Sequence, residues 1–244
     1  MTLSEPEIGA YLATLARVGA LAATGPVIGD QGVATRARLV FVLAITAAIG
    51  ANRAPVAFAA LPLVATAELA IGLVTGLTAR IVMARVAIAG QLIGLSIGLG
   101  FAAQYDAHAG ESAGVMRTLT ATLASLAFLT AGGLEAIVRS AAASPAELSQ
   151  LATLGPALVH HATSAFGHGL ALAAPIVLAA LVGNVALAVL NRAAPAVNVF
   201  SIALSAVLIL GGVVLLATAA HLVAGATATA RAAIDVLASY TGTP

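Results

Sequence analysis

The feature that most constrains this chain is a succession of long apolar runs with few charges inside them. A helix that crosses a bilayer needs about 20 apolar residues, and several of the runs reach that length. The seven segments cover residues 8–29, 39–52, 54–79, 86–104, 118–138, 162–190 and 197–225. Only 8% of all residues are charged, against about 25% in soluble domains. The chain is therefore predicted to be an integral membrane protein.

The form of the apolar runs predicts helices. They are unbroken, whereas the strands of a membrane barrel alternate in polarity over about ten residues. We therefore expect an all-α, polytopic membrane protein with a single membrane domain over residues 1–244. Segment 39–52 is too short to span a bilayer alone, and 162–190 and 197–225 are longer than a span requires. Hydropathy thus leaves the number of crossings open and allows broken helical hairpins.

The arginines carry a modest orientation signal. If all seven segments crossed, six arginines would lie on the side of the C-terminus and three on the opposite side. Cytoplasmic loops are enriched in arginine, so this arrangement places the C-terminus in the cytoplasm and the N-terminus on the far side. It treats Arg80 and Arg85 as parts of a turn between two crossings.

The longest polar interlude, 139–161, predicts a short surface helix. Ser144 is a typical N-cap residue, Pro145 suits the first helical position, and Glu147 would place a negative charge in the first turn. We expect this helix to be separate from the apolar segment that begins at residue 162.

Several functional classes are disfavoured by the residues present. The net charge is +1, and the cationic residues are scattered arginines that form no basic stripe, so no nucleic-acid partner is expected. The chain has no cysteine, which excludes disulfides and thiolate metal sites. His160 and His161 are adjacent and point to different helix faces, while His108, His168 and His221 stand singly, so no metal site is predicted. Because no catalytic or nucleotide-binding motif is present either, we expect neither an enzyme nor a cofactor.

Glycines at four-residue spacing predict close helix packing. Gly90, Gly94 and Gly98 would lie along one flank of a helix, and Gly72 and Gly76 do the same on the preceding segment. Membrane helices associate where small residues let their backbones approach closely. We therefore interpret both sets as packing faces for neighbouring helices.

Glu68 is an acidic residue inside the apolar segment 54–79. A charge at the centre of a membrane helix costs about 2.5–3.5 kcal/mol on insertion scales, so it should pair or face water. Two interpretations stay open: an ion-coupling carboxylate of a transporter, or a structural ion pair or helix-end charge. Arg17 and Arg192 are close enough to segment ends for their side chains to extend to the interface.

Several stretches together resemble one known family. In 166–212, a Leu-x-Arg motif, a proline turn and an apolar helix occur at Leu190, Arg192, Pro195, Asn198, Phe200 and Ile202. Glu68 opens a Glu-x-x-x-Gly segment, and the N-terminal features lie at Arg17, Gly19, Pro26, Arg36 and Arg38. The glycine-rich stretch 89–110 and the loop within it fit the same pattern. In this order, the stretches resemble the FliR family of flagellar and type III secretion export-gate membrane proteins.

The resemblance implies a concrete role. Members form, with FliP and FliQ homologues, a helical assembly of tilted hairpins in the bacterial inner membrane, at the flagellar basal body. FlhB and FlhA homologues are further partners, and unfolded export substrates pass through a central channel. The loop after the glycine-rich helix acts as a plug, which by position covers 101–116 here. The plug residues carried over are Phe101, Gln104, Tyr105, Asp106, His108, Gly110, Glu111 and Met116.

The leading hypothesis is thus a core subunit of a type III protein export gate, of the flagellar kind, in contact with membrane lipid. A small secondary transporter or permease that uses buried Glu68 is the alternative. A membrane scaffold without a conduit is a third. The plug differs from the family pattern at Ala107, where relatives usually have proline.

Overall fold

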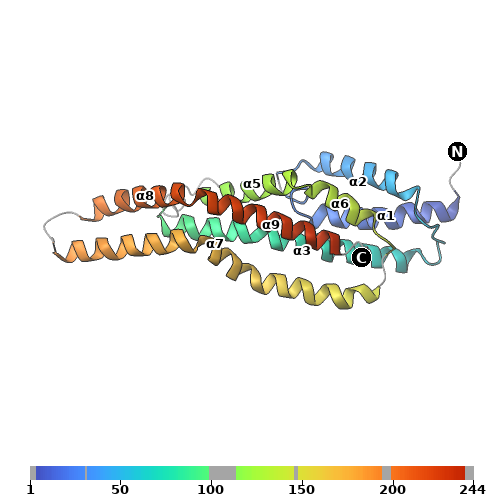
Figure 1. Ribbon diagram of the computed structural model, residues 1–244. Helices are drawn as coiled ribbons and strands as arrows, with labels where there is room; N and C mark the ends of the chain where they lie inside the picture. Colours follow the sequence, from blue (N-terminus) through green and yellow to red (C-terminus); the bar gives the residue numbers. More distant parts are fainter. Residues whose placement is uncertain (1–3, 31, 99–113, 146–147, 194–198, 240–244) are drawn as a thin grey trace. The chain divides into compact units, whose positions relative to one another are not determined.

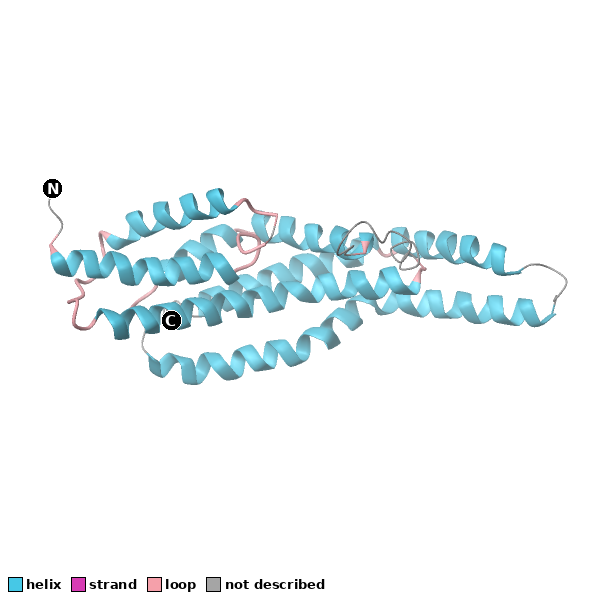
Figure 2. Ribbon diagram, turned by 180° about the vertical axis from the view of Figure 1, so that it is seen from behind, coloured by secondary structure: helices cyan, strands magenta, loops and turns pink. Residues whose placement is uncertain are grey.

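The structure is a computed structural model that describes residues 4–30, 32–98, 114–145, 148–193 and 199–239. These residues are helical apart from turns and short connections (Figures 1 and 2). The helices are α1 Glu5–Thr24, α2 Thr35–Gly50, α3 Leu61–Ser96, α5 Val115–Thr130, α6 Gly133–Ala142, η1 Leu148–Gln150, α7 Leu151–Ala193, α8 Val199–Ala217 and α9 Ala219–Ser239. Within this part of the chain, α3, α7 and α9 are long and apolar enough to cross a membrane. The prediction of an all-α, polytopic membrane protein is confirmed.

The helices form two compact units. Unit 1 consists of Met1–Met83, Phe128–Ser164 and Ala230–Pro244, and it contains α1, α2 and α6. Unit 2 consists of Ala84–Ala127 and Ala165–Thr229, and it contains α8. Each of the helices α3, α5, α7 and α9 contributes residues to both units.

The start of α1 is stabilised by a local pair of residues. The backbone N–H of Ser4 donates to the Glu7 carboxylate at 2.6 Å, and the Ser4 hydroxyl donates to the same oxygen at 2.8 Å. Pro6 occupies one of the first helical positions, where no intrahelical N–H bond is lost. The hydrogen bonds from Ser4 lower the pKa of Glu7. Their contribution to stability is therefore present at neutral pH and is lost as the pH falls through that lowered pKa.

Helix α3 joins two segments that the sequence separates. The predicted turn at Arg80 and Arg85 is wrong, because both residues lie inside one uninterrupted helix of 36 residues. Neither proline nor glycine stands between them, and arginine is a good helix former. At 1.5 Å per residue α3 is about 54 Å long, well beyond the about 30 Å of a bilayer core. The arrangement with seven crossings is therefore wrong at α3, and the membrane orientation derived from it no longer follows.

Two other predicted segments are broken into separate helices. Segment 118–138 becomes α5 and α6, whose axes differ by 63°. The break includes Gly132 at φ 90°, a backbone conformation that glycine adopts without steric cost. Segment 197–225 is divided between α8 and α9, and the Thr218 hydroxyl donates to the Val214 carbonyl at 2.7 Å beside that break. Such bonds from threonine to the preceding turn often bend helices.

The prediction of a separate surface helix within 139–161 is also wrong. The chain passes from Ser144 and Pro145 to the short η1, and α7 then runs through this region and on to Ala193. Glu147 lies outside the described residues. The polar interlude is thus largely the first part of a 43-residue helix, because its sequence from Leu151 onward contains enough good helix formers to continue into the apolar segment.

In unit 1, α1 lies side by side with α2 and also contacts α6 (Figures 1 and 2). Small residues make this packing close. A Cβ on Gly50 of α2 would lie 2.6 Å from Cε1 of the Tyr11 ring of α1, and one on Gly9 would overlap the Val56 carbonyl. The buried face of α1 is built mainly from alanine, glycine, valine and leucine.

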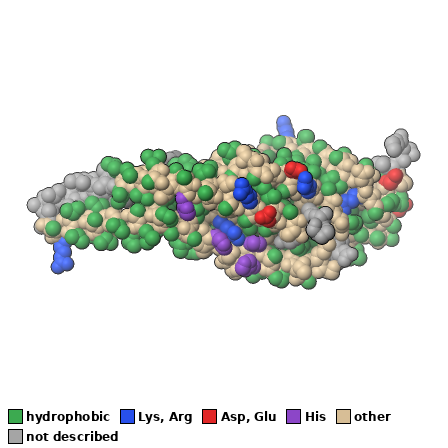
Figure 3. Space-filling model, viewed as in Figure 1, with side chains coloured by type: hydrophobic (Ala, Val, Ile, Leu, Met, Phe, Trp, Pro, Cys, Tyr) green, Lys and Arg blue, Asp and Glu red, His purple; other side chains and the backbone are tan. Residues whose placement is uncertain are grey.

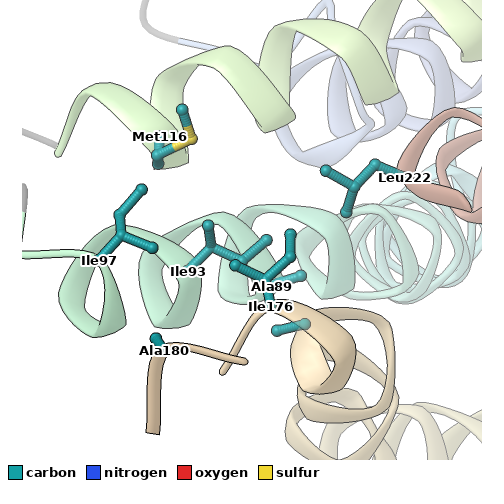
Figure 4. Packing of buried hydrophobic residues seen from close by; sticks show 8 residues of the cluster. Ala89, Ile93, Ile97, Met116, Ile176, Ala180 and Leu222 are labelled. Carbon is teal, nitrogen blue, oxygen red and sulfur yellow. The ribbon is translucent and has the colours of Figure 1, made fainter. Parts of the chain in front are cut away.

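Unit 2 is organised around an apolar cluster. Figure 4 shows Ile93 and Ile97 of α3 between Met116 of α5 on one side and Ile176 and Ala180 of α7 on the other. Ala89 of α3 and Leu222 of α9 complete the labelled set. Many large aliphatic side chains of the described helices are also exposed. Hydrophobic residues are spread over the face shown in Figure 3, and charged residues on it are few. This distribution suits helices that are covered by lipid or by other membrane proteins.

Candidate functional site

The buried charges of unit 1 meet between α1, α3 and the connection that precedes α3. Nε of Arg17 on α1 forms an ion pair with Oε2 of Glu68 on α3. Nη1 of Arg53 lies 3.9 Å from the other carboxylate oxygen. Arg17 is 2% exposed and Glu68 is 3% exposed. These three side chains are called the charge cluster below.

The charge cluster also holds the C-terminal end of α6. Arg17 donates from Nη1 to the Ala143 carbonyl at 2.9 Å and from Nη2 to the Ser144 carbonyl at 3.0 Å. Arg53 donates from Nη2 to the Ala141 carbonyl at 2.8 Å. The last carbonyls of a helix lack intrahelical partners and carry a partial negative charge equivalent to about half an electron. One carboxylate and one helix end therefore offset most of the charge of the two guanidinium groups.

This geometry favours a positioning role for Glu68. Its carboxylate is engaged by two arginines, which supports the ion-pair interpretation over that of an ion-coupling group. An open groove of about 560 Å³ lies over α6 and α9, and Glu68 is not among the residues that line it. The expectation that Arg17 extends to a membrane interface is wrong. Its guanidinium is buried and pairs with the buried carboxylate of Glu68 on α3.

Arg53 is the member of the charge cluster that sequence reasoning missed. The sequence places Arg53 in a connecting loop and indicates no partner for it, because its position between two apolar segments resembles that of any loop arginine. The available signal was indirect: a buried carboxylate requires a cation, and Arg53 lies in the connection that leads into the same helix as Glu68.

Two more arginines hold the loop between α1 and α2. Arg38 donates from Nε to the Ile28 carbonyl at 2.9 Å and from Nη2 to the Asp30 carbonyl at 3.0 Å. Arg80 lies 3.3 Å from the Asp30 carboxylate. Within this loop Val27 has φ 66°, which is unfavourable for a β-branched residue. The contacts from α2 and α3 therefore stabilise a loop conformation that the local sequence alone disfavours.

Gly72 and Gly76 lie where α3 meets the end of α1. A Cβ on Gly72 would stand 2.7 Å from the Arg17 carbonyl oxygen and 2.9 Å from the Ala20 Cβ. One on Gly76 would stand 3.1 Å from the Gly25 nitrogen. These separations leave no room for a larger residue, so the two glycines set the approach of α1 that brings Arg17 to Glu68.

Gly90 and Gly94 face α5 in unit 2. A Cβ on Gly90 would lie 2.6 Å from the Met116 carbonyl oxygen, and one on Gly94 would lie 3.2 Å from the Met116 Cβ. Gly98 differs from this pattern, because α3 ends at Ser96 and Gly98 has φ 81°. It follows the helix end in a conformation that suits glycine rather than extending the packing face.

Most of the predicted plug lies outside the described residues, which resume at Gly114. Phe101, Gln104, Tyr105, Asp106, His108, Gly110 and Glu111 all fall there. The assignment of Met116 to a loop is wrong, because Met116 is in the first turn of α5 and packs in the apolar cluster of unit 2. Arg192 is exposed in the last turn of α7, and Pro195 and Asn198 also lie outside the described residues.

Known proteins are similar to this chain over most of its length. The family described as "Bacterial export proteins, family 1" matches residues 8–232. The flagellar biosynthetic protein FliR of Escherichia coli is 35% identical, over 82% of this chain and 80% of its own. The FliR protein of Caulobacter vibrioides is 32% identical, over 82% of this chain and 85% of its own. That of Pectobacterium carotovorum is 30% identical, over 80% and 78%. Matches of this extent, on an all-helical apolar chain, show that the protein belongs to the FliR family of bacterial export proteins.

Proposed function

We propose that this chain is a core subunit of a flagellar type III export gate in the bacterial inner membrane. Together with FliP and FliQ homologues it forms the channel through which unfolded substrates leave the cell, and FlhB and FlhA homologues complete the apparatus. The observation that carries the proposal is the family match over residues 8–232, with relatives named as flagellar biosynthetic proteins.

The fold supports this proposal in physical terms. Several helices expose aliphatic residues along much of their length, and α2 has only 16 residues and buries one stripe, Val42, Thr46 and Gly50. A helix of that length reaches about 24 Å, less than a bilayer core. Such a chain is suited to an assembly in which neighbouring subunits, as well as lipid, cover its helices.

Co-purification is the first test of the proposal. A tagged copy, expressed in its own host at natural level and extracted in mild detergent, is expected to retain FliP and FliQ homologues through gel filtration. A matched copy with Glu68→Ala, which disturbs the interior of unit 1, should retain less. A chain that runs as a stable particle alone, while functional in motility, would contradict the proposal.

The loop between α3 and α5 provides a second test. Deletion of residues 104–112 is expected to make cells that express the assembled complex permeable to ions and small solutes, because these residues include most of the segment proposed as the plug. The measurement is dye or ion leakage at equal amounts of membrane-inserted complex. The unmodified complex serves as the control, and equal leakage from both would argue against a specific plug.

A further inference from the structure

The turn that follows α1 has a strained backbone at Val27. The N–H of Ile28 donates to the Pro26 carbonyl at 2.8 Å, and Val27 between them has φ 66°. A hydrogen bond across one residue of positive φ belongs to the rare, strained type of γ-turn. A β-branched side chain makes this conformation still less favourable. Glycine would adopt it without steric cost, so valine at this position leaves strain in the loop.

Arginines from two helices hold this turn. Arg38 of α2 donates to the carbonyls of Ile28 and Asp30, at 2.9 and 3.0 Å. Arg80 of α3 donates from Nη2 to the Asp30 carboxylate at 3.3 Å. Asp30 therefore links α2 to α3, through its carbonyl on one side and its carboxylate on the other. The side chains of Arg80 and Asp30 are 41% and 48% exposed, and ion pairs of that exposure contribute little to stability. Arg38, Arg80 and Asp30 are called the loop latch below.

The half of α2 next to this turn has little packing of its own. Its first two turns, residues 35–41, contain no buried side chain, and the buried residues of the helix are Val42, Thr46 and Gly50. Gly50, at the far end, lies against the Tyr11 ring of α1. Packing thus fixes the far half of α2, whereas the contacts of Arg38 hold the near half.

The strain and the loop latch act in opposite directions. Strained residues persist where the surrounding structure holds them, and they gather at switch regions. When the loop latch opens, Val27 can return to a negative φ, and the two arginines and Asp30 exchange their contacts for contacts with water. Part of the free energy that is lost with the contacts is regained at Val27. The strain therefore narrows the free-energy gap between the latched and the released arrangement.

We propose that the turn at residues 25–30 is a conformational switch. In the latched state Asp30 ties the first two turns of α2 to α3. In the released state Val27 relaxes, and this half of α2 moves away from α3 while Gly50 stays packed on α1. The inference goes beyond the proposed function and does not depend on it, because every contact that carries it lies within unit 1.

Thiol protection measures the released fraction. The chain has no cysteine, so Ile28→Cys places a single thiol at a position that is 9% exposed. The purified chain in detergent is then labelled with a maleimide. Adding Val27→Gly, which removes the strain, is expected to slow labelling by about 5- to 150-fold, the factor that corresponds to the strain of one such residue. Asp30→Asn and Arg38→Met should speed labelling. Val27→Ile keeps the β-branch and is the matched control, with an unchanged rate.

A second thiol separates local release from unfolding of unit 1. Val18 of α1 is 1% exposed, so the thiol of Val18→Cys reacts when the unit unfolds. The thiol at position 28 is expected to react faster than the one at position 18. Equal rates would show that position 28 opens only with unfolding, and they would overturn the switch. An unchanged or faster rate at position 28 on adding Val27→Gly would overturn it as well.

The movement of α2 is measured as a distance. Nitroxide labels on Ala37→Cys of α2 and Leu77→Cys of α3 occupy exposed positions, and pulsed electron paramagnetic resonance gives the distance between them. Arg38→Met is expected to add a population at longer distance, and Val27→Gly in the same background should reduce it. One identical distance in all variants would contradict the release of α2. Failure to retain FliP and FliQ homologues would instead contradict the proposed function and leave these measurements on the isolated chain unaffected.

Discussion

Replacing Glu68 by alanine is expected to destabilise unit 1 by about 3–5 kcal/mol, the usual effect of removing one partner from a buried charge group. Arg17 and Arg53 would then keep their positive charges in the interior without the carboxylate that compensates them. The measurement is reversible unfolding of the purified protein in detergent, followed by circular dichroism. A parallel readout is the fraction of chain that survives limited proteolysis in membranes.

Four matched variants separate charge from packing at this site. Glu68→Gln keeps the shape and loses the charge, so it should be nearly as damaging as alanine. Arg53→Met should be milder than Arg17→Met, because Arg53 lies 3.9 Å from the carboxylate and makes one carbonyl contact where Arg17 makes two. The double variant Arg17→Met with Glu68→Met should lose less than the sum of the single changes. Additive losses would show that the pair acts independently.

Replacing Gly90 by leucine is the second change with a large expected effect. Even a single Cβ at this position would stand 2.6 Å from the Met116 carbonyl oxygen, which is backbone and cannot rotate away. The contact forces α5 away from α3 and opens the apolar cluster around Ile93. Overpacking of this kind typically costs about 1–3 kcal/mol and can cost more. Thermal unfolding and the yield of assembled complex are the measurements.

A graded series of glycine variants gives this prediction its control. Gly94→Ala meets the Met116 side chain at 3.2 Å, which a small shift can relieve, so it should cost less than Gly90→Ala. Gly167→Ala in α7 meets nothing within 4 Å, and it should be neutral or stabilising because alanine favours a helix by roughly 0.5–1 kcal/mol over glycine. If all three alanine variants were alike, the spacing of the glycines would be incidental.

Several parts of the fold could be predicted because they depend on local properties of the chain. Helical, membrane-embedded structure follows from apolar runs long enough to satisfy their own backbone hydrogen bonds in lipid. Spacing alone predicts glycine packing faces at 72/76 and at 90/94/98, since residues four apart share a helix face. In the structure Gly72 and Gly76 approach α1 and Gly90 and Gly94 approach α5, whereas Gly98 lies beyond the end of α3. The role in an assembly, which the resemblance assigns to the plug, stays a prediction.

The errors concern where helices begin and end. Hydropathy predicts a turn at Arg80 and Arg85, although a helix tolerates arginine wherever the side chain finds a partner, as Arg80 does in Asp30. The break at Gly132 and the division beside Thr218 lie within apolar stretches that hydropathy treats as continuous. Hydropathy averages over a window and is therefore insensitive to single residues that end, bend or extend a helix.

The sequence by itself determined that this chain is a helical membrane protein of an export family, because hydropathy, residue spacing and ordered motifs are properties of the linear chain. The tertiary structure decided which charges meet. Arg17 reaches Glu68 and the end of α6, 126 positions away at Ala143, and no local pattern specifies a pairing over that separation. The pairing depends on the close packing of α1, α3 and α6. Small residues such as Gly72 permit this packing, and the buried carboxylate of Glu68 requires a cation beside it.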